Sequence, residues 1–295
     1  MKASAVVFAL ALGLMVSALV IGCKSSTEPI AGYNEPASMV AANSEATADM
    51  TATALGNQTG GMQMAMEDSY DLALSGQVSS VDSKGNVINT LSATYDSTTG
   101  WHTIIVTRNI AWGNSTITSD FQYQYQYLNT AGGFVKNWHK DSVDVMSFKF
   151  AGVRDRERGT RVDLDDTASG NWTITGLANF NANPLVSGSY SSSGADTLFT
   201  QNNNLRALSH SFQHTITNDT LIRVLPNQDK YFFLKGTGSS TFHASDNKGN
   251  IIDRTVAITY NGDGTATLDV TRTKDGTTTT FTVDVWRGVF LRWGR

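Results

Sequence analysis

Cysteine is nearly absent from this chain, which contains only Cys23. A disulfide within the chain is therefore excluded, and the fold must be held by burial of side chains, for which 295 residues are ample. Proline is also scarce, because only Pro184 and Pro226 occur after residue 36. This scarcity favours segments whose backbone amides donate to neighbouring strands. Together the two absences indicate a β-rich body without cross-links.

A surplus of basic residues is missing too. The chain has 22 Lys and Arg against 26 Asp and Glu, a formal net charge of −4, whereas proteins that bind nucleic acid usually carry a basic face. No G-x-S-x-G turn, phosphate-binding loop or dinucleotide fingerprint occurs in the sequence. We therefore expect no nucleic-acid partner and no cofactor, and a protein that is not an enzyme is favoured over an enzyme.

One long apolar run follows Met1 and Lys2 and ends at Ile21. It is about long enough to cross the roughly 30 Å of a bilayer core, so it predicts either a membrane anchor or a signal peptide over residues 1–22. The single lysine before the run and the polar stretch after it favour the signal peptide.

The residues that close this run, Val20-Ile21-Gly22-Cys23, resemble the lipobox of bacterial lipoproteins. The resemblance covers residues 1–24 only. It implies cleavage after Gly22, fatty acyl chains such as palmitate on Cys23, and a membrane as partner, since several chains hold a protein on a bilayer where one is marginal. It also implies the cell envelope. Because Lys24 stands where an aspartate usually retains such proteins at the inner membrane, the outer membrane is expected. An ordinary signal peptide followed by a free cysteine is the alternative.

Composition divides the remaining chain into two parts. Residues 23–69 are rich in Ala, Ser, Thr, Met and Asn and contain no Trp or Phe, so they predict a flexible tether. A short helix that begins near Pro36 and ends at Gly56 is compatible with this segment. The three alternating methionines of residues 60–66 have no His or Cys beside them, which favours an apolar linker over a copper site.

From Tyr70 to residue 295 the pattern changes to alternation with a period of two. Segments rich in Thr, Val, Ile, Tyr and Phe predict strands at 104–112, 116–128, 142–150, 171–180, 254–260, 266–272 and 278–286. Clusters such as DSTTG, NGDG and TKDG lie between strands and supply the positive φ angles of hairpin turns. Residues 70–295 are therefore predicted to be all-β, an antiparallel meander of hairpins that forms a β-sandwich or an open, barrel-like sheet.

An internal repeat suggests two related halves. Residues 84–108 and 248–272 share Lys-Gly-Asn at the start, Thr-Tyr near the middle and Val-Thr-Arg at the end. Either the body contains two related meanders, with equivalent hairpin loops at Lys84–Asn86 and Lys248–Asn250, or the segments are alike because hairpins with Gly-Asn turns resemble one another.

One strand carries the clearest candidate binding face. In FQYQYQY, alternation places Phe121, Tyr123, Tyr125 and Tyr127 on one face and three glutamines on the other. Such a row could stack on sugars or line a lipid groove. It could equally be the core face of the sheet, where tyrosine hydroxyls find partners. The four residues are the predicted ligand face, with core packing as the alternative.

The charges concentrate in RDRERGTRVDLDD, residues 154–166. Alternating signs favour a solvated connector between two sheet halves, although paired carboxylates could act on glycosides, and Asp163, Asp165 and Asp166 could bind Ca²⁺. His210 and His214 could share a metal ion on a helix, but on a strand they stand about 13 Å apart. No metal site is therefore predicted.

Two functional hypotheses follow. The preferred one is a lipid-anchored, non-enzymatic envelope protein with a binding or structural role, whose glycan, lipid or protein ligand is unknown. The alternative is an envelope glycan hydrolase that uses carboxylates of residues 154–166.

Overall fold

The computed structural model describes residue 35 and residues 37–75, 88–90, 94–112, 115–139, 141–158, 162–178, 183–199, 205–223, 232–246 and 249–291. All of them belong to one compact unit, Asn34–Arg295. The predicted signal peptide and Cys23 lie outside the described residues.

The described part of the chain begins with helices. A short 3-10 helix, η1 (Ala37–Met39), leads into α2 (Val40–Leu55), and α3 (Met62–Ser75) follows after a turn. Alanine favours the helical conformation of α2. Gly56 ends α2 in extended backbone, and its amide donates to the backbone oxygen of Thr53.

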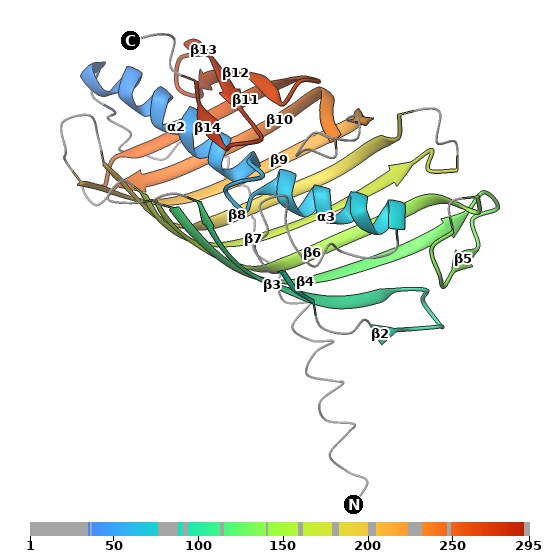
Figure 1. The fold of residues 1–295 in the computed structure, drawn as a ribbon. Coiled ribbons are helices and arrows are strands. Elements are labelled where there is room, and N and C mark those ends of the chain that lie inside the picture. The colour runs from blue at the N-terminus through green and yellow to red at the C-terminus, as the bar shows by residue number, and fades with distance from the viewer. Residues whose placement is uncertain are drawn as a thin grey trace, which may run out of the picture. The chain divides into compact units, whose positions relative to one another are not determined.

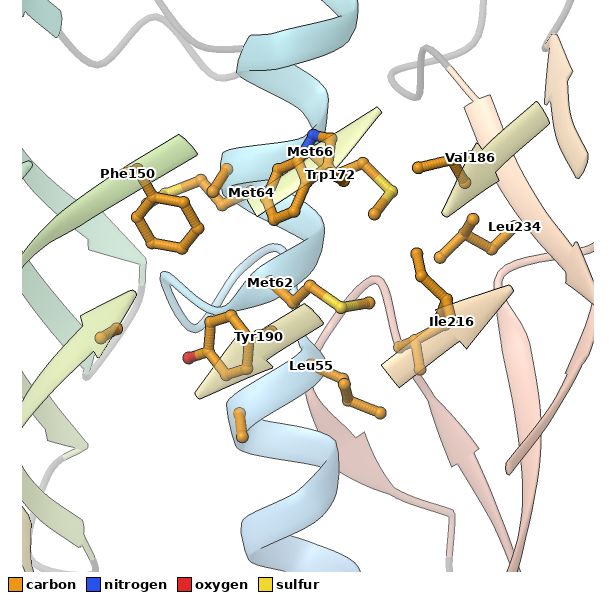
Figure 2. Close-up of a cluster of buried hydrophobic side chains, with 14 of the residues drawn as sticks. Leu55, Met62, Met64, Met66, Phe150, Trp172, Val186, Tyr190, Ile216 and Leu234 are labelled. Carbon is orange, nitrogen blue, oxygen red and sulfur yellow. The ribbon is translucent and has the colours of Figure 1, made fainter. Parts of the chain in front are cut away.

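The two helices occupy the segment for which the sequence predicts a flexible tether. The side chains of Met62, Met64 and Met66 are at most 5% exposed and belong to the hydrophobic core. Figure 2 shows them with Leu55 on the helices, facing Phe150, Trp172, Val186, Tyr190, Ile216 and Leu234 from the strands. The prediction of a flexible tether over residues 40–69 is therefore wrong, and so is the domain boundary at residue 70.

The rest of the described chain forms one antiparallel sheet of fourteen strands. They are β1 (Ile88–Thr90), β2 (Thr94–Tyr95), β3 (His102–Trp112), β4 (Ser115–Asn129), β5 (Phe134–Val135), β6 (Val143–Arg158), β7 (Val162–Thr175), β8 (Leu185–Phe199), β9 (Leu205–Arg223), β10 (Phe232–Asp246), β11 (Ile251–Asn261), β12 (Thr265–Arg272), β13 (Thr278–Asp284) and β14 (Val289–Phe290).

The strand order follows the chain. It runs β1-β3-β4-β6-β7-β8-β9-β10-β11-β12-β13-β14, with β2 beside β3 and β5 beside β4. Short hairpin connections make such a meander, as the turn clusters predict. The predicted all-β, antiparallel class is confirmed, and the arrangement is a single open sheet.

The two faces of the sheet differ. Helix α2 contacts β12, β13 and β14, while α3 contacts β6, and Figure 1 shows both helices lying across one face, here called the inner face. Along β11 every second residue is buried, including Val256, Ile258 and Tyr260. The residues between them, such as Thr255 and Thr259, are exposed on the opposite, outer face. Period-two alternation thus produces one core face and one polar face.

The two repeated segments both fold as antiparallel pairs of strands. Residues 248–272 contain β11 and β12, and residues 84–108 contain β1, β2 and the first part of β3. Gly249 has φ 76° in the turn between β10 and β11, where a hairpin loop was predicted. Lys84–Asn86 lie outside the described residues.

Candidate functional site

The predicted ligand face lies on β4, and the structure turns it inward. Its side chains, those of Phe121, Tyr123, Tyr125 and Tyr127, are each at most 5% exposed. The Tyr123 hydroxyl bonds to the carboxylate of Asp68, and the Tyr127 hydroxyl donates to the backbone oxygen of Leu72 at 2.8 Å. Helix α3 supplies both partners. The prediction of an open ligand face is therefore wrong, and the four residues form a packed core face.

The tyrosine row belongs to an aromatic band that crosses the inner face. Directly opposed residues on successive strands are Tyr95, His102, Tyr125, Phe148 and Trp172. The rings of His102 and Tyr125 are stacked with centroids 4.7 Å apart, and those of Phe148 and Trp172 are stacked at 5.1 Å. Cross-strand pairs of this kind stabilise a sheet by roughly 0.2–1 kcal/mol each. The band is deeply buried at Trp172 but only half-buried at Tyr95.

A polar stripe runs beside the aromatic band. Strand register places Arg108, Ser119, Arg154 and Asp166 in line on the inner face. Arg154 Nε donates to Asp166 Oδ1 at 2.8 Å, and Arg154 Nη1 donates to the backbone oxygen of Thr59 at 3.2 Å. Buried charges are tolerated only with such partners. Arg154 is thus neutralised within the sheet and capped by the chain between α2 and α3, whereas Arg108 pairs with Asp68 of α3.

The predicted charge cluster, residues 154–166, is divided between the two faces. Its described residues, 154–158 and 162–166, are parts of β6 and β7 rather than of a solvated connector, so that prediction is wrong for them. Arg154 and Asp166 are buried on the inner face, whereas Asp155 and Asp165 are exposed and directly opposite each other on the outer face. Asp165 and Asp166 therefore point away from each other, which removes the predicted calcium alternative. The side chain of Asp163 is not among those that the structure describes.

The two predicted histidines share the inner face of β9 but not a partner. His210 Nδ1 lies 3.0 Å from Asp196 Oδ2. His214 Nδ1 is 2.8 Å from the Ser240 hydroxyl, and its Nε2 is 2.8 Å from the Tyr260 hydroxyl. Burial lowers the pKa of His214 to about 3, which keeps the imidazole neutral. Among the described residues, no three His, Cys, Asp or Glu side chains converge as metal ligands.

One exposed and two half-buried aromatic side chains lie where the aromatic band reaches solvent. We call the group formed by Tyr95, Trp101, Phe134, Lys136 and Lys149 the rim patch. Phe134 is 53% exposed, and the two other rings are half-buried. Lys149 Nζ lies 4.2 Å from the centroid of the Trp101 ring, and Lys136 Nζ lies 5.3 Å from that of Tyr95. Cation–π contact of this kind holds the lysines beside the rings.

Two tight turns build the rim patch. In the turn between β2 and β3, the Asp96 carboxylate accepts hydrogen bonds from the Thr98 amide at 2.9 Å and the Thr99 hydroxyl at 2.7 Å, which lowers the pKa of Asp96. In the hairpin between β4 and β5, Asn129 Oδ1 accepts from the Gly133 amide at 2.9 Å. The first turn positions Trp101, and the second positions Phe134.

Sequence reasoning missed the rim patch because its members come from separate turns and strands. The available signal was local: Trp101 follows the turn DSTTG, and Phe134 and Lys136 follow the glycines of the next hairpin. Large apolar residues beside turns, without an alternating partner, are candidates for exposed binding positions.

Comparison with known proteins gives no independent assignment. No protein-family model, no curated protein and no solved structure matches the chain. In the part of the chain that the structure describes, none of the helices combines the length and the apolar character needed to cross a membrane.

Proposed function

We propose that this chain is a lipid-anchored cell-envelope protein with a non-enzymatic binding role, held at the outer membrane through Cys23. The observation that carries the proposal is the sequence Val20-Ile21-Gly22-Cys23 directly after the apolar run. A thiol is the nucleophile that a diacylglyceryl transfer needs, and no second cysteine competes for it. The anchor is the proposed membrane partner.

The length of chain between the anchor and the folded unit fits this role. Glu35 is already fixed, because its carboxylate forms ion pairs with Arg254 at 2.6 Å and Arg272 at 2.8 Å. Twelve residues from Cys23 to Glu35 span at most about 40 Å when fully extended. The folded unit would therefore work close to the bilayer instead of at the end of a long tether.

A binding role is favoured over catalysis by the placement of the candidate groups. The buried carboxylate of Asp166 is bonded to Arg154, and the histidines of β9 are paired within the core. The exposed rings and lysines of the rim patch instead form a surface that a partner can reach. Exposed aromatic side chains are enriched at binding surfaces because they bring large apolar area together with a polar edge.

One observation favours the alternative, a glycan hydrolase. Asp155 and Asp165 lie directly opposite each other on exposed positions of β6 and β7. Opposed residues have Cβ atoms about 5 Å apart, which is the scale of carboxylate pairs in retaining glycosidases. Turnover of envelope glycans by the wild type that is lost in Asp155→Asn and Asp165→Asn would establish the hydrolase and remove the non-enzymatic proposal.

The anchor is tested by mass spectrometry of material isolated from its native membrane. The expected N-terminal peptide begins at Cys23 and carries acyl chains, and a Cys23→Ala variant leaves the membrane fraction or keeps its uncleaved apolar run. A native chain with an unmodified Cys23 thiol would overturn the proposal.

A further inference from the structure

We propose that the rim patch is a second membrane contact, which docks on the anionic headgroups of the bilayer to which Cys23 anchors the chain. This inference rests on the proposed lipid anchor, because the anchor brings the bilayer within reach. It assigns the exposed rings to the interface between headgroups and acyl chains, and the lysines to the phosphate groups.

The composition of the patch fits an interface between water and lipid. Trp and Tyr are enriched where headgroups meet acyl chains, because each has an apolar ring and a polar edge. Phe134 adds an apolar ring that is 53% exposed at a hairpin, and Lys136 follows it on the chain. Surface-binding segments combine such residues, with apolar groups for insertion and lysines for anionic lipid.

Charge complementarity points to an anionic surface. The chain has a formal net charge of −4, yet the rim patch carries two lysines, Lys136 and Lys149, against one carboxylate, Asp96, in the turn that builds it. A basic, aromatic patch on an acidic protein orients that protein toward negative charge. Anionic headgroups attract each nearby lysine by about 1 kcal/mol, or roughly five-fold in affinity.

The ring geometry disfavours a sugar as the occupant. A sugar stacks on a free aromatic face, but Lys149 covers one face of Trp101. Tyr95 is contacted by His102, with centroids 4.6 Å apart, and by Lys136. One face of Trp101 and the ring of Tyr95 are therefore occupied by cations and a neighbouring ring, which leaves less open ring area for a sugar to stack on.

The test uses the full lipidated chain with one new cysteine. Because Cys23 is acylated in that material, a polarity-sensitive thiol probe attached to Phe134→Cys labels the rim patch alone. The matched control is Thr259→Cys, at an exposed position of β11 on the outer face. Both proteins are reconstituted into vesicles with brominated acyl chains, made either of zwitterionic lipid or with a third of anionic phosphatidylglycerol.

The expected result is quenching and a blue shift of the probe at position 134 in anionic vesicles, with little change in zwitterionic vesicles or at position 259. Charge reversal by Lys136→Glu and Lys149→Glu should lower the ratio of docked to undocked protein roughly 30-fold, from about 1 kcal/mol per lysine. Lys235→Glu, at an exposed position of β10, is the charge control and should change nothing.

The outcomes separate this inference from the proposed anchor. If Cys23 is acylated and the probe at position 134 stays unquenched in anionic vesicles, the rim-patch inference is overturned while the anchor stands. The same holds if soluble anionic glycan, and not lipid, shifts the probe. If Cys23 itself takes up the thiol probe, Cys23 is not acylated, and the proposed lipid anchor is overturned together with the inference that rests on it.

Discussion

Asp68 on α3 and Arg108 on β3 form a buried ion pair that fastens the N-terminal helices to the sheet. Their side chains are 7% and 1% exposed, and the Tyr123 hydroxyl bonds to both of them. A helix that is rich in small and polar residues is thus held by charge and hydrogen bonding as well as by its methionines. The pair explains why a segment that reads as a linker is part of the core.

Removal of one partner should be costly. We expect Asp68→Ala to lower the free energy of unfolding by about 3–5 kcal/mol, because Arg108 is then a buried charge without a counter-ion. Asp120→Ala, at an exposed position of β4, should change it by less than about 0.5 kcal/mol. Urea unfolding of both variants measures the difference, and equal midpoints would contradict the role of the pair.

Neighbouring aspartates on β7 offer a test of the two faces. Asp166→Asn removes the carboxylate that binds Arg154 on the inner face, whereas Asp165→Asn alters an exposed side chain on the outer face. We expect the first to lower the free energy of unfolding by about 3 kcal/mol or more, and the second by less than about 0.5 kcal/mol. Comparable losses in urea titrations would mean that the alternation of β7 is misassigned.

Much of the sheet could be predicted from the sequence because period two and turn chemistry are local. The alternation of FQYQYQY places Tyr123 and Tyr125 on one face, and that face is continuous in the structure. The pattern does not say what covers the face. The sequence pattern of a tyrosine row is the same whether a ligand or the chain's own helix covers it. The sequence alone therefore does not decide between a ligand face and a core face.

The tether prediction failed because α2 buries small polar residues. Asn43, Thr47 and Thr51 are at most 1% exposed, and Thr53 accepts a hydrogen bond from Arg156 of the sheet. A composition rule counts such residues as solvent-facing. Here Asn43 bonds to Glu35 and Thr47 to the backbone oxygen of Asn43, while the sheet supplies Arg156 as the partner of Thr53. These partners become visible only in the folded chain.

A pH dependence follows from Glu67 on α3. Burial raises the pKa of Glu67 to about 8 from 4.5, and the hydrogen bond from Asn57 opposes this only in part. Between these values the folded chain keeps a proton that the unfolded chain has lost, so stability falls as pH rises from about 4.5 to about 8. The slope cannot exceed about 1.4 kcal/mol per pH unit because one group exchanges one proton. Partial exposure of the side chain lowers the total loss over this pH range.

Glu67→Gln should remove this contribution. Subtraction of the variant's unfolding free energies from those of the wild type, measured in urea at several pH values, isolates it from His214 and Asp219, which titrate in both proteins. The difference should decline from pH 4.5 to 8 and be flat above pH 8. A difference that does not vary with pH would show that Glu67 is ionised in the fold.

Truncation should separate the true start of the folded unit from the predicted one. A chain that begins at Asn34 keeps Glu35, α2 and α3, whereas a chain that begins at Tyr70 leaves the inner-face aromatic residues uncovered. We expect the first to unfold cooperatively in urea and the second to aggregate or to bind the dye ANS strongly. Cooperative unfolding of the Tyr70 chain at an unchanged midpoint would restore the interpretation of residues 40–69 as a tether.

Two glycines in the turns of the rim patch differ in one respect that can be measured. Gly100 and Gly132 have φ angles of 72° and 80°, so alanine at either position is strained by about 1–2 kcal/mol. An added Cβ at Gly100 would also lie 2.6 Å from Cγ of Phe134, whereas one at Gly132 would meet nothing within 4 Å.

Gly100→Ala should therefore lower the free energy of unfolding more than Gly132→Ala and displace the Phe134 ring. In a Phe134→Gly background, which also removes the Cβ of Phe134 that lies 3.0 Å from the added Cβ, the two glycine variants should become equal, because only the backbone strain then remains. If Gly100→Ala stays costlier in that background, the turn is not shaped by its contact with Phe134.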